Sequence, residues 1–224
     1  MNRMLEENVR EMGVHLPLGK VVLEGDLAIP AEAKGIVLFA HGSGSSRLSS
    51  RNRFVAHYLQ RQGLATLLFD LLTHDEEQID NYTMELRFDI GLLGGRLSDA
   101  TAWVGGQKEI RDLAIGYFGA STGGAAALIA ETKNPGVVKA IVSRGGRPDL
   151  AGRALGQVQA PTLLIVGGHD GQVIQLNEQA MEQLSGIKKL AIVPGATHLF
   201  EEPGALESVA QLAAGWFLKY LPAV

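Results

Sequence analysis

The sequence predicts an α/β fold in which helices cover both faces of a mostly parallel sheet. Short apolar runs of strand length alternate with longer helical stretches along most of the chain. Some runs, such as Ile36–Ala40, are apolar without interruption, which is typical of strands buried on both faces. Two strand-like segments come first, with no helix between them, and they indicate an opening hairpin.

The expected elements follow from these patterns in chain order. Val9–Leu16 and Val21–Ile29 form the hairpin around a turn at Pro17–Lys20. The later strands are expected at Ile36–Ala40, Ala65–Phe69, Leu113–Phe118, Val137–Ser143, Thr162–Val166 and Lys189–Val193. Helices are expected at Arg53–Gln62, Glu85–Gly105, Ser121–Thr132, Gln175–Leu184 and Ala205–Leu221. The paired glycines at 94 and 95 weaken the second of these helices.

Composition limits the classes of function. The 224 residues show no repeat or linker, so we expect a single domain over residues 1–224. A net charge of −4 gives no reason to expect a nucleic acid or a membrane surface as partner. The absence of cysteine excludes disulfides, thiolate metal sites and a cysteine nucleophile. Met1–Gly13 has mixed charges unlike a secretory signal, so a cytoplasmic location is expected.

The most specific chemical signal is Gly119–Gly124, which reads Gly-Ala-Ser-Thr-Gly-Gly. It lies directly after the expected strand Leu113–Phe118 and directly before an alanine-rich helix. This is a G-x-S-x-G pattern in a strand–turn–helix context, where a tight turn requires small residues on both sides of the serine. The pattern predicts Ser121 as a catalytic nucleophile, with a serine N-cap in a glycine-rich turn as the structural alternative.

A serine nucleophile needs a general base, and that base needs an orienting acid. His198 follows the last expected strand and Asp170 follows the strand before it, so the chain order is Ser, Asp, His. Ligands of parallel sheets bind beyond the carboxyl ends of the strands, where all three residues are expected. Asp149, after the preceding strand, is a competing candidate for the acid or a helix N-cap, and we favour Asp170.

The loop His41–Ser46 after the strand Ile36–Ala40 is rich in glycine and serine. An acyl-transfer site needs backbone N–H donors for the oxyanion, each worth roughly 3–4 kcal/mol. We expect one donor from Thr122, directly after the nucleophile, and the other from Ser43 in this loop. The alternatives are a flexible turn or a phosphate-binding loop, although the Lys-Ser/Thr of a P-loop is missing.

Together these segments resemble the α/β-hydrolase superfamily from about Lys20 to Leu221, and more narrowly its dienelactone-hydrolase-like group. The narrower resemblance is carried by the stretches His41–Arg47, Leu67–Thr73, Gly116–Gly123 and His198–Pro203. They are similar to small bacterial hydrolases that also occur fused to a phosphoribosyltransferase domain, which this chain does not contain. The resemblance implies an eight-stranded α/β-hydrolase fold, the triad Ser121, Asp170 and His198, and the oxyanion donors named above.

One difference from the family bears on the substrate. Dienelactone hydrolases proper use a cysteine nucleophile, whereas this chain has Ser121, so the dienelactone substrate is not carried over. The connection Arg144–Pro161 is too short for a lid domain. An open site is therefore expected, and it suits small substrates.

Arginines near the strand ends are candidates for substrate binding. Arg47, Arg51 and Arg53 follow the oxyanion loop, and Arg144 and Arg147 follow a strand end. An arginine can bind a substrate carboxylate through two parallel hydrogen bonds, and pairing with a neighbouring acid is the alternative. Arg47, Arg144 and Arg147 are the candidates that we retain.

His74 is a further candidate for substrate binding. It lies in the acidic connection Leu71–Glu85, which we expect to form a second wall of the site. Without a second histidine at ligand spacing, a solvated loop is a better interpretation than a metal site. We expect no metal and no cofactor.

The sequence thus predicts a serine hydrolase that cleaves carboxylic esters of small substrates through an acyl-enzyme intermediate. A lactonase, thioesterase or peptidase would use the same triad, and the sequence does not separate them. A non-catalytic binding protein on this fold is the rival hypothesis, and it would predict a damaged triad or turn. The expected partner is a small-molecule ester, and the expected state is a monomer or a homodimer.

Overall fold

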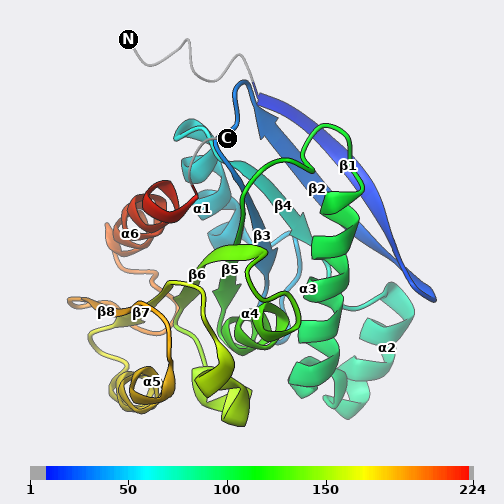
Figure 1. The fold of residues 1–224 in the computed structure, drawn as a ribbon. Helices are drawn as coiled ribbons and strands as arrows, with labels where there is room; N and C mark the ends of the chain where they lie inside the picture. Colours follow the sequence, from blue (N-terminus) through cyan, green and yellow to red (C-terminus); the bar gives the residue numbers. More distant parts are fainter. Residues whose placement is uncertain (1–8, 222–224) are drawn as a thin grey trace.

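Eight strands form one mixed sheet in the order β1-β2-β4-β3-β5-β6-β7-β8 in the computed structural model, which describes residues 9–221 (Figure 1). The strands are β1 (Val9–Leu18), β2 (Val21–Pro30), β3 (Ile36–Ala40), β4 (Ala65–Phe69), β5 (Ile115–Ala120), β6 (Val138–Arg144), β7 (Thr162–Gly167) and β8 (Lys188–Val193). The opening hairpin β1–β2 and the pair β2–β4 are antiparallel, and all other pairs are parallel. The predicted mostly parallel eight-stranded sheet is confirmed.

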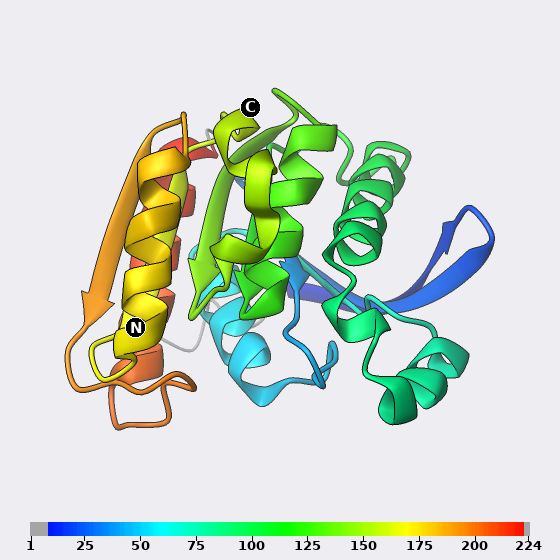
Figure 2. The ribbon, with the colours of Figure 1, turned by 90° about the horizontal axis from the view of Figure 1, so that it is seen from below.

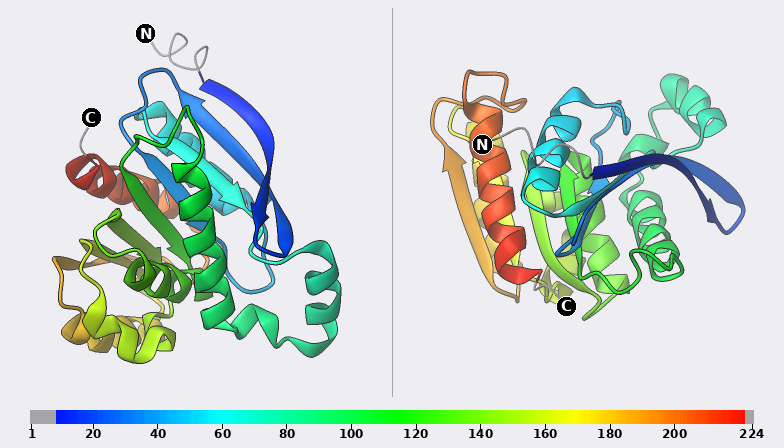
Figure 3. Two further views of the ribbon diagram at one scale, coloured as in Figure 1. Left: turned by 45° about the vertical axis from the view of Figure 1, so that its right-hand side comes forward. Right: turned by 90° about the horizontal axis from the view of Figure 1, so that it is seen from above.

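Helices cover both faces of this sheet. They are α1 (Ser50–Arg61), α2 (His74–Thr83), α3 (Ile90–Gly105), α4 (Thr122–Lys133), α5 (Gly171–Gln183) and α6 (Ala205–Tyr220), with short 3₁₀ segments η1 (Leu86–Phe88) and η2 (Pro148–Gln157). Figure 2 shows α3, α4 and α5 on one face, and the right panel of Figure 3 shows α1 and α6 on the other. Only η2 and short loops join β6 to β7, so no lid domain is inserted there.

The apolar pattern of β3 explains its central place. Its residues alternate between two core clusters: Leu38 packs with the α3 and α4 side, and Val37 and Phe39 pack with the α1 and α6 side. All five residues of the strand are buried, as expected for a strand covered on both faces.

The connection after β4 contains the helix α2, so its prediction as a solvated loop is wrong. Thr73 accepts a hydrogen bond from the Glu76 amide at 3.2 Å, and the Glu76 carboxylate accepts one from the Thr73 amide at 2.8 Å. This capping box begins the helix and uses an acid that was assigned to solvent. The same carboxylate bonds Arg96 of α3 at 2.6 Å, so the acidic segment is tied to the fold.

The helix expected from Glu85 begins later, at Ile90. Asp89 provides the N-cap by accepting a hydrogen bond from the Leu92 amide at 2.9 Å. Gly94 was expected to weaken this helix, but it has a packing role. A Cβ at Gly94 would lie 2.7 Å from the Ile129 side chain of α4, so the two helices approach closely at a residue without a side chain.

The order of the strands places a crevice beside β3. The chain leaves β3 for β4 on one side and then returns to form β5 on the other side of β3. Ligands bind at such switch points, beyond the carboxyl ends of the strands. The last residues of these strands are neighbours, with Ala40 opposite Gly119, so the loops that carry Ser43 and Ser121 start side by side.

The structure covers only part of the N-terminal segment from which the absence of a secretory signal was predicted. Residues 1–8 of the charged segment Met1–Gly13 lie outside the described residues. Among residues 9–221, no helix has both the length and the apolar character needed to cross a bilayer.

Candidate active site

Ser121 occupies a sharp turn between β5 and α4. Its backbone has φ +53° and ψ −120°, a combination that non-glycine residues rarely adopt and that is typical of functional sites. A Cβ at Gly123 would lie 2.1 Å from the Ala40 carbonyl oxygen, and one at Gly119 would lie 2.3 Å from the Gly123 carbonyl oxygen. Both glycines of the G-x-S-x-G pattern are therefore required by close backbone contacts.

The replacement Gly123→Ala is expected to destabilise the protein by more than about 3 kcal/mol, because the new methyl group overlaps a main-chain carbonyl. The free energy of unfolding in urea measures this. Gly105→Ala is the matched control, since it lies at the end of α3 and a Cβ added there would have no atom within 4 Å. That control should change stability by about 1 kcal/mol or less. Equal stabilities of the two variants would contradict the close contact.

His198 and Asp170 are in direct contact. The His198 Nδ1 atom lies 2.6 Å from the Asp170 Oδ2 atom. Asp170 follows β7 and His198 follows β8, and backbone hydrogen bonds hold the two loops together, including His169 to Ala196 at 2.9 Å. The competing acid, Asp149, instead accepts two hydrogen bonds from Arg147, at 2.9 and 2.7 Å. The structure therefore brings Asp170, and not Asp149, to His198.

The loop after β3 approaches the serine turn closely. A Cβ at Gly42 would lie 3.1 Å from the Ser121 Cβ. His41 anchors this loop, because its Nε2 atom accepts a hydrogen bond from the Leu71 amide at 3.0 Å and its Nδ1 atom lies 3.0 Å from the Gly42 carbonyl oxygen. Burial lowers the pKa of His41 and so favours the neutral ring, and the two hydrogen bonds place its proton on Nδ1. Among residues 9–221, the backbone amides of Ser43 and Thr122 make no hydrogen bond to a carbonyl oxygen in the turns, loops and helix caps. This is consistent with their expected role as oxyanion donors.

The end of β6 supports the turn from the other side. The Ser121 amide donates to the Arg144 carbonyl oxygen at 3.2 Å, and the Ser121 carbonyl oxygen accepts from the Arg147 amide at 3.1 Å. These two bonds fix the main chain of Ser121 on both sides of its Cα atom. They use the backbone of Arg144 and leave its side chain available.

Four of the predicted residues line one cavity of about 250 Å³: Ser43, Ser121, Arg144 and His198. Its lining comes from the loops after β3, β5, β6 and β8 and from the start of α1. The residues that line it are Gly42, Ser43, Ser45, Ser49, Arg51, Asn52, Ala120, Ser121, Arg144, His198 and Leu199. The proposed nucleophile and base thus share one space with the oxyanion loop, and Asp170 lies behind His198.

A family model described as the dienelactone hydrolase family matches residues 23–217, which is most of the chain. The chain belongs to the dienelactone hydrolase family. It is 60% identical to a solved dienelactone hydrolase of Anabaena variabilis, with a TM-score of 0.94, and the match covers 96% of this chain and 100% of that one. The predicted family resemblance is confirmed.

Other relatives place this dienelactone hydrolase family member in a wider group. A Mycobacterium tuberculosis protein with a provisional phosphoribosyl transferase name is 54% identical over 213 residues. That match covers 95% of this chain and 47% of the relative, so the chain spans about half the length of the curated relatives that it matches. Est1E of Butyrivibrio proteoclasticus, solved with ferulic acid, shares the fold at 16% identity and a TM-score of 0.78, over 92% of this chain and 98% of Est1E.

Of the four retained candidates for substrate binding in this family member, Arg144 lines the cavity and Arg47, Arg147 and His74 do not; Arg51, which was considered but not retained, lines it as well. Arg47 forms ion pairs with Asp70 and with Glu24, the latter at 2.7 Å. Arg147 is held by Asp149, as described above. Arg47 and Arg147 therefore follow the alternative given in the sequence analysis, which is pairing with a neighbouring acid.

His74 lies outside the cavity as well. It is the first residue of α2, and its Nε2 atom lies 2.9 Å from the Gln78 side-chain nitrogen one turn later. Among residues 9–221, no group of three or more His, Asp or Glu side chains is arranged to hold a metal ion.

Sequence reasoning missed Asn52, which is 2% exposed and lines the cavity. The cause is the start of α1, which was predicted at Arg53 and lies at Ser50. The first turn of the helix therefore brings Arg51 and Asn52 into the site. Ser49, whose hydroxyl accepts a hydrogen bond from the Asn52 amide at 3.3 Å, is the N-cap signal that could have located this start.

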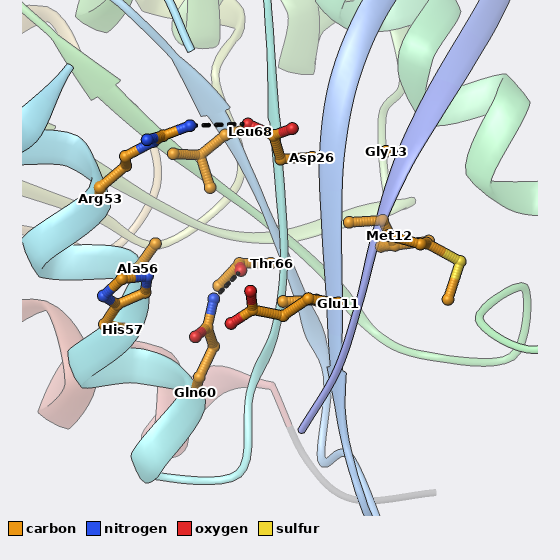
Figure 4. Close-up of a pocket in the computed structure, with 12 residues that line it drawn as sticks. Glu11, Met12, Gly13, Asp26, Arg53, Ala56, His57, Gln60, Thr66 and Leu68 are labelled. Carbon is orange, nitrogen blue, oxygen red and sulfur yellow. Dashed lines mark hydrogen bonds and ion pairs between the residues drawn. The ribbon is translucent and has the colours of Figure 1, made fainter. Parts of the chain in front are cut away.

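A second pocket, of about 420 Å³, lies between α1 and strands β1, β2 and β4 (Figure 4). Its polar groups bond one another: Arg53 pairs with Asp26 at 3.2 Å, and Gln60 donates to Thr66 at 2.8 Å. None of Ser121, His198 and Asp170 lines it. The candidate residues Ser121 and His198 therefore line the smaller cavity and not this pocket.

Proposed function

We propose that the chain is a serine hydrolase that cleaves carboxylic esters of small substrates. The observation that supports this most strongly is the convergence of Ser121 and His198 on one cavity, with Asp170 2.6 Å behind the histidine ring. A small cavity of about 250 Å³ favours small esters over long acyl chains. Membership of the dienelactone hydrolase family supports hydrolytic chemistry at this site.

In the proposed reaction, the Ser121 hydroxyl attacks the carbonyl carbon while His198 Nε2 accepts its proton. Asp170 holds the proton on Nδ1 and stabilises the imidazolium that forms. The Ser43 and Thr122 amides donate to the oxyanion of the tetrahedral intermediate. His198 then gives its proton to the leaving alcohol, and the acyl group stays on Ser121. Water, deprotonated by His198, hydrolyses this acyl-enzyme and releases the acid.

A fluorophosphonate probe tests the nucleophile directly, because it phosphonylates only an activated serine. We expect stoichiometric labelling, with the adduct on the peptide that contains Ser121 by mass spectrometry. Heat-denatured protein is the control and should not react. A folded sample that stays unlabelled would support the rival hypothesis of a binding protein on this fold.

The bond that is cleaved needs a separate measurement, since lactones, thioesters and peptides suit the same residues. Initial rates with p-nitrophenyl esters of increasing acyl length, beside lactones, would rank these substrates. We expect short acyl chains to give the highest kcat/KM, because the cavity is small. Highest rates with long chains would contradict the proposed preference for small esters.

A further inference from the structure

Arg144, the last residue of β6, is a buried cation with no acidic partner among residues 9–221. It is one of the residues that line the cavity with Ser121 and His198, and it is 7% exposed. Its Nε and Nη1 atoms are buried and have no hydrogen-bond partner among residues 9–221. Burial, with a contribution from the positive charge of Arg51, lowers its pKa to about 10, so the guanidinium stays charged at neutral pH.

Such a group is costly to bury unless something compensates its charge. The similarly buried Arg96, which is 8% exposed, bonds Glu76 at 2.6 Å. Within residues 9–221, the only compensating group beside Arg144 is the ring of Phe200, with a guanidinium-to-centroid distance of 5.9 Å, and a cation–π contact of this kind is weak. The fold therefore leaves at this position a charge that a bound molecule can neutralise.

The other residues that line the cavity also favour a negatively charged ligand. None of its lining residues is an Asp or a Glu. Arg51 adds a second guanidinium, whose carboxylate partner Glu201 lies 3.3 Å away with 65% of its side chain exposed, a weak arrangement in solvent. Asn52, at 2% exposure, adds an amide whose oxygen has no partner in the described chain. These groups face the same space as the serine.

We infer that the cavity selects esters that carry an anionic group, a carboxylate or a phosphate, with Arg144 as its main partner and Arg51 as its second. The inference rests on the proposed ester hydrolysis at Ser121. Guanidinium groups bind such anions through charge-assisted hydrogen bonds, which are stronger in a cavity with little water than in solution.

Matched substrates test this selectivity. 4-Acetoxybenzoate and 4-acetoxybenzamide differ only in carboxylate against amide and place that group on the alcohol part. Monoethyl adipate and ethyl adipamate place it on the acyl part. In at least one pair, kcat/KM corrected for the hydroxide-catalysed rate should favour the anion by roughly tenfold or more. 4-Acetoxyphenyl phosphate, compared with 4-acetoxybenzoate, distinguishes a phosphate from a carboxylate.

Variants connect the selectivity with the arginines. Arg144→Gln should reduce the anion-to-neutral ratio by roughly 10- to 100-fold, and Arg51→Gln should reduce it less. Arg53→Gln is the matched control for Arg51→Gln, because both arginines lie in α1 and Arg53 lines the other pocket. It removes one positive charge, and the anion-to-neutral ratio should stay unchanged. Circular dichroism checks folding. If Arg144→Gln does not fold, Arg144→Lys and Arg51→Gln provide the test.

Binding measurements separate this inference from the proposed function. Calorimetry should show tighter binding of 4-hydroxybenzoate than of 4-hydroxybenzamide, and Arg51→Gln should reduce the difference. This result would support the anion site even if no ester were hydrolysed, an outcome that would overturn the proposed function alone. Equal turnover and equal binding of charged and neutral partners would overturn the anion site and leave ester hydrolysis standing. A preference for anions that survives in the folded arginine variants would also overturn it.

Discussion

Replacing Ser121 by alanine is expected to lower kcat for ester hydrolysis by about ten-thousand-fold to a million-fold. The side chain removed is the proposed nucleophile, and it shares the cavity with His198, whose ring contacts Asp170. The backbone strain at φ +53° should be similar for alanine, so the variant is expected to fold. Steady-state kinetics with a p-nitrophenyl ester measures the loss, and a thermal melt measures the fold.

Ser143→Ala is the control for this experiment. Ser143 lies in β6 next to the serine turn and is fully buried, and its hydroxyl has no hydrogen-bond partner in the described chain. Removing an unsatisfied hydroxyl should leave stability unchanged or raise it by about 1 kcal/mol. Activity should stay near that of the wild type, because Ser143 does not line the cavity. Full activity of Ser121→Ala would place the nucleophile elsewhere.

The second large effect is expected for Asp170→Asn, which should lower kcat by about ten-thousand-fold. An asparagine can donate to Nδ1 through its amide, and this would favour the ring tautomer in which Nε2 carries the proton. That ring cannot accept the serine proton. This loss is expected because Asp170 lies 2.6 Å from the His198 Nδ1 atom, where the asparagine amide would replace its carboxylate. Pre-steady-state rates with a p-nitrophenyl ester would show the loss in acylation.

Asp149→Asn is the matched comparison, because Asp149 competes with Asp170 for the role of the acid in the sequence. The structure pairs it with Arg147 on a partly exposed surface, where the ion pair is worth about 1 kcal/mol or less. Its kcat should therefore stay within a few-fold of the wild-type value. A large loss for Asp149→Asn together with an active Asp170→Asn would reverse the assignment.

Sequence patterns predicted the sheet well because the signals for its strands are local. The uninterrupted apolar run of β3 predicts a strand buried on both faces, and the glycines around Ser121 predict a tight turn. Asp170 and His198 were placed correctly at strand ends, but the contact between them depends on two loops 28 residues apart. The sequence favoured Asp170 over Asp149 by its place after the penultimate strand, and only the three-dimensional arrangement shows that Asp170 contacts His198 whereas Asp149 bonds Arg147.

The substrate side of the site was harder to predict, because it depends on which charges are already neutralised. Arg47 and Arg144 look alike in the sequence, and only the fold shows that Asp70 and Glu24 bond the first while no acid of the described chain bonds the second. The missed helix α2 is a different case. Its capping box, Thr73 with Glu76, was readable in the sequence and was outweighed by the acidic composition of the segment.

The bond from the Ser121 amide to the Arg144 carbonyl oxygen, at 3.2 Å, has a consequence for the evolution of this enzyme class. One residue supports the proposed nucleophile with its main chain and, by the inference above, binds the substrate with its side chain. A mutation at position 144 leaves the supporting carbonyl in place, whichever amino acid replaces the arginine. A lineage can therefore change the substrates that it accepts in single steps, without rebuilding the machinery that breaks the bond.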